Sequence, residues 1–289
     1  MRSKVLIAVI AVIAVVCIGV IIFASFRKSP TPVARPSEVV KEVPVYKVIG
    51  TSVQGRKIES FVYGTGPKNI ALVGGMHGGY EWNSVLLAYT AMDYLKANPT
   101  AIPKNLSVTI IPAINPDGVY KVTGKVGRFN ISDVSTSTKI LAAGRFNAHA
   151  VDLNRNFDCK WSPKATWQNK TVSAGPKAFS EPESQSVRDF VLEAKPDAVV
   201  FWHSAANAVY ASECEKGILP VTLDIMNAYS KASGYKPVKS FSAYPVTGDS
   251  EGWLASLNIP AITVELKSHD SIEWSQNLAG IKALLEYFK

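Results

Sequence analysis

The sequence contains little of several features that would indicate particular classes of protein. It has three cysteines and four histidines in 289 residues, and only 19% of its residues are charged. Although the formal net charge is +8, there is no run of Lys and Arg with interleaved aromatic residues, so no nucleic-acid partner is expected. There is neither an internal repeat nor a second linker, which favours one large folded domain. The 47% apolar fraction is ordinary for a chain that buries a core.

Charge is also absent from one long stretch near the start of the sequence. Residues 5–26 are uncharged and almost wholly apolar. This stretch exceeds the roughly 7–15 apolar residues of a cleaved signal peptide and matches the ~20 residues that span a bilayer. Two basic residues flank it on each side, and the terminal amine adds positive charge to the first side. We therefore expect residues 1–28 to be a single-pass signal-anchor, or transmembrane, segment in the cell membrane that places the following domain outside the cytosol. A cleaved, secreted form is left open.

The segment after this span is rich in proline. Residues 29–45 have the composition of an extended tether, and the folded domain is expected to occupy residues 46–289. Cys159 and Cys214 are the two cysteines of that domain, and an even pair in an exported domain is a candidate disulfide. The alternative is a pair of buried thiols.

In the folded domain, short apolar runs alternate with helical patterns. Strands are expected at 69–74, 106–114, 197–202 and 260–266, and helices at 81–95, from 182 onward, at 220–233 and at 278–288. A turn is expected at 115–118 and a capping box at 180–183. The alternation predicts an α/β fold with a mixed, mostly parallel twisted sheet and helices on both faces. In such sheets, ligands bind beyond the carboxyl ends of the strands.

Two of the four histidines follow predicted buried strands. His77 lies in the glycine-rich segment 74–79, and Glu81 follows four residues later in the first turn of a predicted helix. His203 follows the strand at 197–202. Two His and one Glu with an open fourth position form a catalytic zinc set. The alternative for each histidine alone is a hydrogen-bonded structural role, and the remaining two, His149 and His269, lack a comparable setting.

Further polar residues lie near the same predicted edge of the sheet. Glu265 near the end of a buried strand is a candidate general base, and a solvent-facing glutamate is the alternative. In residues 151–158, an extended conformation would place Asp152, Asn154 and Asn156 on one side, with Arg155 pointing elsewhere. Arg145 adds a second cation to this region. Arg and Asn side chains suit the recognition of a carboxylate, and a salt-bridged loop is the alternative.

Several motifs together resemble a known family. The segments GGMHGGYE, NPDG, GRFNAHAVDLNRNF, FWHS and TVEL occur in the order found in the zinc carboxypeptidases related to carboxypeptidase A, from about Ile49 to Leu266. The chain resembles a bacterial-type, membrane-anchored member of this metallocarboxypeptidase family. The resemblance implies a carboxypeptidase A-like, phosphorylase/hydrolase-type α/β fold and one Zn²⁺ per chain.

The resemblance also implies roles for individual residues. By this resemblance the zinc ligands are His77, Glu81 and His203, and Asp152 orients His77. Glu265 is the general base, and Arg145 polarises the scissile carbonyl. Asn154 and Arg155 bind the substrate carboxylate, Tyr244 is the capping tyrosine, and Glu251 is the specificity residue. One departure is the three residues between His77 and Glu81, because the common family spacing is two.

The expected activity is zinc-dependent hydrolysis of the C-terminal bond of peptides, or of cell-wall peptides, that carry a free C-terminal carboxylate. Glu251 would favour a C-terminal Lys or Arg, or the free amine of a cell-wall diamino acid. The alternative is that Asp249 and Glu251 are solvated loop charges. Two other functions are a zinc deacylase or amidohydrolase of small acylated amino acids, and a surface peptide-binding protein without turnover.

Overall fold

The computed structural model describes residues 44–289. The predicted transmembrane segment, 1–28, and the tether up to residue 43 lie outside the described residues. Among the helices of residues 44–289, none combines the length and hydrophobicity of a membrane span.

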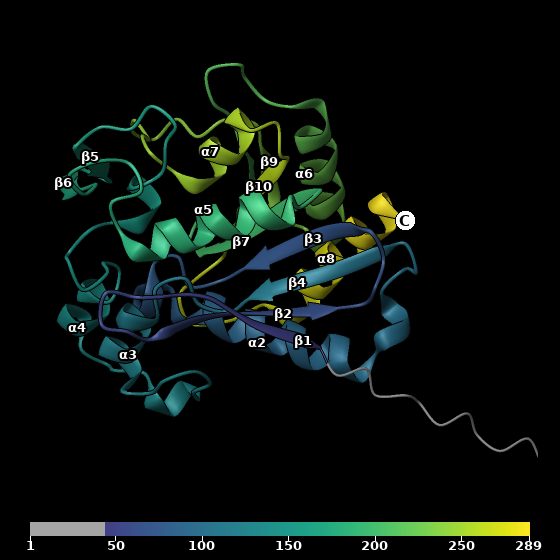
Figure 1. The fold of residues 1–289 in the computed structure, drawn as a ribbon, viewed down its shortest axis with the longest axis horizontal. Helices are drawn as coiled ribbons and strands as arrows, with labels where there is room; N and C mark the ends of the chain where they lie inside the picture. The colour runs from purple at the N-terminus through teal and green to yellow at the C-terminus, as the bar shows by residue number, and fades with distance from the viewer. Residues whose placement is uncertain (1–43) are drawn as a thin grey trace, which may run out of the picture. The chain divides into compact units, whose positions relative to one another are not determined.

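A large mixed sheet forms the centre of the described part of the chain. Its strands are β1 (Val45–Thr51), β2 (Lys57–Tyr63), β3 (Lys68–Val73), β4 (Leu106–Ile111), β7 (Ala198–Ser204), β8 (Ala208–Ala211), β9 (Lys236–Val238) and β10 (Ala261–Leu266). They lie in the order β1-β2-β4-β3-β7-β10-β8-β9 (Figure 1). A separate hairpin pairs β5 (Lys164–Trp167) with β6 (Lys170–Ser173).

The four central strands of the sheet run parallel to one another. β3 pairs in parallel with β4 and β7, and β7 pairs in parallel with β10, whereas β1, β2 and β8 introduce antiparallel pairs. The predicted mixed, mostly parallel sheet is therefore confirmed. Because β3, β7 and β10 are adjacent and parallel, their carboxyl ends meet at one edge, which is where the predicted polar residues lie.

Helices cover both faces of this sheet, as predicted. They are α2 (Trp82–Ala97), α3 (Pro116–Thr123), α4 (Thr138–Ala143), α5 (Pro182–Ala194), α6 (Pro220–Ser233), α7 (Ser250–Ser256) and α8 (Trp274–Phe288), with the 3₁₀ helices η1 (Gly78–Glu81), η2 (Pro99–Ala101), η3 (Ile131–Asp133) and η4 (Leu153–Arg155). Apolar residues of α2, α6 and α8 form one core cluster with one face of the sheet, and residues of α5 and α7 form a second with the other face. Figure 1 shows α5 and α7 on the opposite side of the sheet from α2 and α8.

The segment Asn-Pro-Asp-Gly at 115–118 begins a helix, so the prediction of a turn was wrong. Asn115 is the N-cap of α3, and its side-chain oxygen accepts a hydrogen bond from the Gly118 N–H at 2.8 Å. Pro116 occupies the first turn, where the missing N–H of proline leaves no intrahelical bond unmade. The same residues that favour turns thus also favour a helix start.

The predicted capping box at 180–183 was also wrong, although the helix does start there. The N-cap residue of α5 is Glu181, which makes no side-chain capping bond. Ser180 Oγ donates to Glu181 Oε1 at 2.8 Å. The carboxylate of Glu183 accepts hydrogen bonds from Val53 N–H and from the Asn147 side chain. The side chains of Ser180 and Glu183, which a capping box would bond to the backbone of the first helical turn, therefore bond to other partners.

Candidate metal centre

The three proposed metal ligands come from two neighbouring strands and the helix after one of them. His77 follows β3 and immediately precedes η1, Glu81 ends η1, and His203 lies near the end of β7. All three side chains are buried, with exposures of 5%, 2% and 1%. Within the described residues, they are the one group of three His, Cys, Asp or Glu residues whose ligand atoms lie within 4.8 Å of one another.

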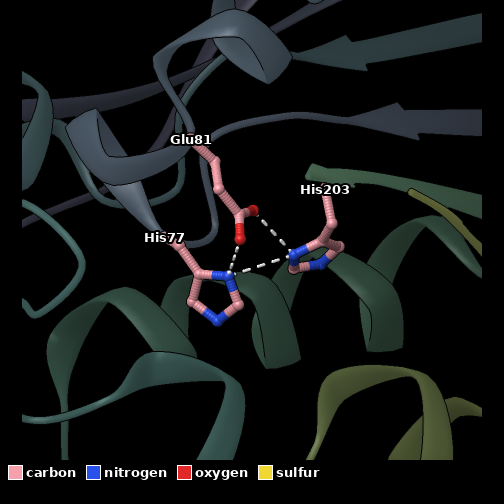
Figure 2. Close-up of side chains that lie close together, drawn as sticks. All are labelled: His77, Glu81 and His203. Carbon is pink, nitrogen blue, oxygen red and sulfur yellow. Dashed lines mark hydrogen bonds and ion pairs between the residues drawn. The ribbon is translucent and has the colours of Figure 1, made fainter. Parts of the chain in front are cut away.

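Their side chains converge on a common point. Figure 2 shows the Glu81 carboxylate facing both imidazole rings. Glu81 Oε1 lies 2.8 Å from His77 Nδ1 and Glu81 Oε2 lies 2.9 Å from His203 Nδ1, while the two Nδ1 atoms are 3.1 Å apart. Two ligand atoms bound to zinc at 2.0–2.1 Å with tetrahedral angles lie ~3.3 Å apart. The observed spacings are slightly shorter than this, and the two carboxylate distances involve different oxygens of Glu81, so the two imidazole nitrogens and the Glu81 carboxylate fit around one zinc ion after a small expansion.

Electrostatics also favour a cation at this point. Burial lowers the pKa of His203, but the charges of Glu81 and Glu251 outweigh it and raise that pKa well above 6.5. Burial disfavours the charged form of Glu81 as well, yet the two histidines lower its pKa. Two ring nitrogens cannot both direct lone pairs at each other across 3.1 Å without a proton or a metal ion between them. The donor set therefore fits a divalent metal.

The extra residue between His77 and Glu81 is accommodated by η1. Gly78 adopts a left-handed conformation, with φ of 47°. A Cβ atom at Gly79 would lie 2.6 Å from the backbone oxygen of Gly118 and would collide with Val122 in α3. This close packing brings Glu81 back to His77, so the unusual spacing does not separate the two side chains.

Asp152 connects His77 to Arg145. Its Oδ1 lies 3.4 Å from His77 Nε2, and its Oδ2 accepts from Arg145 Nε at 2.9 Å. Burial alone would raise the pKa of Asp152, but the Arg145 guanidinium and His77 hold it well below the usual range. Arg145 Nη1 is 3.8 Å from Glu81 Oε1, so a fixed positive charge lies beside the ligand carboxylate.

Asp152 precedes the short 3₁₀ helix η4, so the extended arrangement considered for residues 151–158 does not occur at residues 153–155. The Asp152 side chain accepts a hydrogen bond from the Asn154 N–H. The resulting rotation sends Asn156 away from the metal centre, where its amide bonds to Ala174 O, Lys177 O and Ser180 Oγ. Asn156 is therefore a structural residue, whereas Asp152 faces His77.

Glu265 lies next to the metal ligands on β10. It is the register partner of His203 across the parallel pair β7–β10. Its Oε2 atom is buried and has no hydrogen-bond partner among the described residues. Burial, and secondarily the charge of Glu81, raise the pKa of Glu265 to about 7. A carboxyl group with this pKa can both accept and release a proton near neutrality.

The residues expected to grip a substrate carboxylate lie on η4. Asn154 Oδ1 accepts from Ser250 N–H at 2.9 Å, which leaves its amide N–H groups as donors. Arg155 is 3% exposed, and its Nε donates to Thr166 O at 3.1 Å in the β5–β6 hairpin. Both side chains are thus held from behind by neighbouring loops.

The two residues expected to define substrate preference lie in different environments. The Tyr244 ring is partly buried and packs against Phe241 with centroids 4.8 Å apart. Burial chiefly, and then the charges of Glu81 and Glu265, raise the pKa of Tyr80 against the lowering effect of Arg145. Glu251 is 4% exposed and accepts hydrogen bonds from Thr263 Oγ1 and Ser250 Oγ. This burial excludes the alternative that Glu251 is a solvated loop charge.

Sequence reasoning missed three residues at this site. The centroid of the Tyr80 ring lies 4.8 Å from that of the His269 ring and 5.4 Å from that of the Trp167 ring. The Trp167 centroid also lies 4.4 Å from Cζ of the Arg145 guanidinium. His269 Nδ1 is 2.8 Å from Ser204 Oγ, next to His203. The one sequence signal for His269 is that it follows Glu265 by four residues. Trp167 belongs to a hairpin whose path depends on tertiary packing, so its sequence carries no such signal.

Cys159 and Cys214 form a disulfide near the substrate-binding residues. Gly248 donates its N–H to Cys159 O at 2.7 Å, and Phe157 donates its N–H to Gly248 O at 2.9 Å. The disulfide fastens the segment after Arg155 to the loop between β8 and α6, and the two Gly248 bonds fasten the same segment to the loop that carries Tyr244.

Comparison with known proteins was consistent with this geometry. A family model described as "Zinc carboxypeptidase" matches residues 41–277. The chain is 25% identical over 240 residues to gamma-D-glutamyl-L-diamino acid endopeptidase 1 of Lysinibacillus sphaericus, covering 76% of the chain and 60% of that protein. It is 28% identical over 153 residues to carboxypeptidase B of Astacus astacus, covering 50% of the chain and 48% of that protein. The chain thus spans about half to three fifths of the length of these relatives.

A solved structure shares the fold. The murein-tripeptide amidase from Escherichia coli O157 superimposes with a TM-score of 0.61 at 24% identity, covering 87% of this chain and 96% of that one. At this identity the likeness concerns the arrangement of the elements and not the substrate.

Proposed function

The chain belongs to the zinc carboxypeptidase family, and from that premise we propose that it hydrolyses the C-terminal peptide bond of peptides, including cell-wall peptides, that end in a free carboxylate. The observation that carries this proposal is the convergence of His77, Glu81 and His203 beside Glu265 at one edge of the sheet. The murein-peptide and diamino-acid relatives support a cell-wall peptide as the substrate class.

His77 Nδ1, His203 Nδ1 and a Glu81 oxygen would hold the zinc ion. When bound, zinc supplies a Lewis acid that lowers the pKa of a water molecule to about 7 and polarises a carbonyl group. Asp152 Oδ1 lies 3.4 Å from His77 Nε2, and its negative charge favours the tautomer with the proton on Nε2, which leaves the Nδ1 lone pair for the site.

Glu265 moves the protons of the reaction. Its raised pKa allows the carboxylate to take a proton from the attacking water and the resulting carboxylic acid to give that proton to the leaving amine. Within residues 44–289 its Oε2 atom has no partner, so it can make the hydrogen bond to water that this role needs. The partly buried setting keeps bulk water from competing for the proton.

Arg145 stabilises the negative charge that develops on the scissile carbonyl oxygen. Its guanidinium is fixed by Asp152 and by stacking against Trp167, so it is already in place beside Glu81 before the substrate arrives. Such preorganised charge is a large contributor to rate enhancement because it needs no reorganisation during the reaction.

Asn154 and Arg155 bind the terminal carboxylate of the substrate. Arg155 presents its guanidinium edge as a rigid fork, and Asn154 adds an amide donor. A free carboxylate on the substrate would thereby align the last peptide bond with Glu265.

One experiment tests the proposal. The purified full-length chain is expected to contain one zinc ion per chain and to release single C-terminal amino acids from a peptide library that includes cell-wall peptides. Zinc would be measured by elemental analysis and products by mass spectrometry. Release of an acyl group from small acylated amino acids, without release from peptides, would favour the deacylase. Binding of peptides without release of any product would indicate a peptide-binding protein without catalytic activity.

A further inference from the structure

Each of the two ligand histidines directs its second ring nitrogen at a buried carboxylate. His77 Nε2 lies 3.4 Å from Asp152 Oδ1, and His203 Nε2 lies 3.4 Å from Glu251 Oε1. We propose that Glu251 is a positioning residue of the metal centre, which holds the ring of His203 as Asp152 holds the ring of His77. This inference rests on the proposed zinc site.

The tautomer of His203 gives the first step of the argument. Its Nδ1 atom faces Glu81 and His77, so that nitrogen must present a lone pair if a metal is bound there. The ring proton then resides on Nε2, which is buried and makes no hydrogen bond within residues 44–289, with Glu251 Oε1 3.4 Å away. A buried N–H without an acceptor is costly, and the Glu251 carboxylate is at hand to receive it.

The Glu251 carboxylate is itself fixed in place. Its Oε1 atom accepts from Thr263 Oγ1 at 3.0 Å, and its Oε2 atom accepts from Ser250 Oγ at 2.9 Å. The residue belongs to the first turn of α7, whose N-cap is Asp249. With donors on both oxygens, the carboxylate keeps one orientation, which a residue that fixes an imidazole ring requires.

These same contacts argue against direct binding of a substrate ammonium by Glu251. Thr263 and Ser250 each donate to one oxygen of this carboxylate, His203 lies beside it, and Glu251 is only 4% exposed, which leaves little access for an ammonium group. Its charge instead acts through His203. A carboxylate at the distal nitrogen increases the basicity of the ligand histidine and thus its affinity for zinc.

Ser250 connects this arrangement to substrate binding. Its hydroxyl lies 2.9 Å from Glu251 Oε2 and 3.0 Å from Asn154 Oδ1, and one hydroxyl proton can serve only one of these acceptors at a time. The metal-positioning carboxylate and the proposed carboxylate-binding amide therefore share a donor.

The test is the zinc affinity of the full-length chain with Glu251→Gln, measured by competition with a chromophoric chelator. Loss of the carboxylate at similar size is expected to weaken zinc binding by about 10–100-fold. The visible absorption bands of the Co²⁺-substituted protein should also shift, because the His203 ligand changes. These readouts do not depend on turnover.

Asp249→Asn is the matched control. It removes a neighbouring acid from the same helix start but keeps a capping side chain, and the zinc dissociation constant should not change. Glu251→Asp should recover part of the lost affinity. If Glu251→Gln does not fold, Thr263→Val removes one of the donors that fix Glu251 and should weaken zinc binding to a smaller extent.

Two results would count against the inference in different ways. Unchanged zinc affinity and an unchanged cobalt spectrum in Glu251→Gln, with a raised KM for peptides ending in Lys, would overturn it and make Glu251 a specificity residue. Absence of stoichiometric zinc in the unaltered chain would instead overturn the proposed function together with this inference.

Discussion

Glu81 contacts both ligand histidines and is the one carboxylate among the three proposed zinc ligands. Each of its carboxylate oxygens lies within 3 Å of one Nδ1 atom. Glu81→Ala is therefore expected to abolish stoichiometric zinc, because two imidazoles alone leave half of a tetrahedral site unfilled. Elemental analysis after dialysis measures this, with Glu286→Ala at an exposed position as the control. Full zinc retention in Glu81→Ala would remove this residue from the site.

Glu265 should affect turnover without affecting the metal. Glu265→Gln keeps the size of the side chain but cannot accept a proton, and kcat is expected to fall by about 10²–10⁴-fold. Zinc content and the circular dichroism spectrum should match those of the unaltered chain. A kcat close to the unaltered value would eliminate Glu265 as general base.

The charged form of the Asp249 carboxyl group is expected to lower the free energy of unfolding, and this effect depends on pH. Burial, and then the charge of Glu251, raise the pKa of Asp249 from 3.8 to about 6. The folded chain thus binds this proton more tightly than the unfolded chain. The contribution of Asp249 to stability falls as pH rises from about 4 to 6 and stays low above that range.

Asp249→Asn should remove this dependence while keeping the N-cap hydrogen bond to Gly252. At pH 8 the variant is expected to be more stable by up to roughly 2–3 kcal/mol, since one pKa unit corresponds to about 1.4 kcal/mol. At pH 4 the two proteins should be nearly equal. Urea unfolding at both pH values measures the difference. Equal stability at pH 8 would show that the Asp249 carboxylate is well solvated.

The side chains at strand ends were predictable from sequence for a physical reason. His77, His203 and Glu265 each accompany a short apolar run, and parallel buried strands bring their carboxyl ends together. His269 was not predictable in this way, because its place beside Ser204 depends on the path of the loop after β10.

At the scale of secondary-structure elements, the four central strands β3, β4, β7 and β10 and the long helices followed the sequence closely, whereas β1, β2, β5, β6, β8 and β9 were not predicted. The helix expected at 220–233 is observed as Pro220–Ser233 and ends at Gly234 in a left-handed conformation. Short elements did not follow it. The segment 151–158 alternates like a strand, yet the Asp152 side chain accepts from the Asn154 N–H and turns the chain into η4. Local side-chain bonds of this kind compete with the extended conformation and leave no periodic pattern.

The disulfide joins the segment after Arg155 to the loop between β8 and α6. Cys159 and Cys214 are 55 residues apart, and a closed loop of this length stabilises a folded chain by about 2–4 kcal/mol. The double variant Cys159→Ser, Cys214→Ser is expected to lose that amount in urea unfolding.

Reduction of the unaltered chain with dithiothreitol provides the control for this prediction. Reduction should lower the melting temperature of the unaltered chain to about that of the double variant. The melting temperature of the double variant should not change when the reductant is added. Unchanged stability in both cases would mean that the hydrogen bonds between Gly248 and the 157–159 segment suffice on their own.

At the scale of the whole molecule, the family match begins at residue 41, after the apolar stretch and most of the proline-rich tether. The sheet and its two helical layers account for the catalytic machinery. We propose that residues 5–26 anchor this domain to a membrane with the domain on the extracytoplasmic side. The disulfide supports this location, because disulfides persist in oxidising compartments outside the cytosol.

Fractionation of a bacterial host that expresses the full chain with an epitope tag after Lys289 tests this proposal. The protein is expected in the membrane pellet, with release by detergent but not by high salt, because an apolar span of this length partitions into the bilayer core. A chain without residues 5–26 should be recovered in the supernatant. Protease added to intact spheroplasts should remove the tag if the domain faces outward. A tag that survives until the spheroplasts are lysed would place the domain in the cytosol, where cell-wall peptides are not the expected substrate.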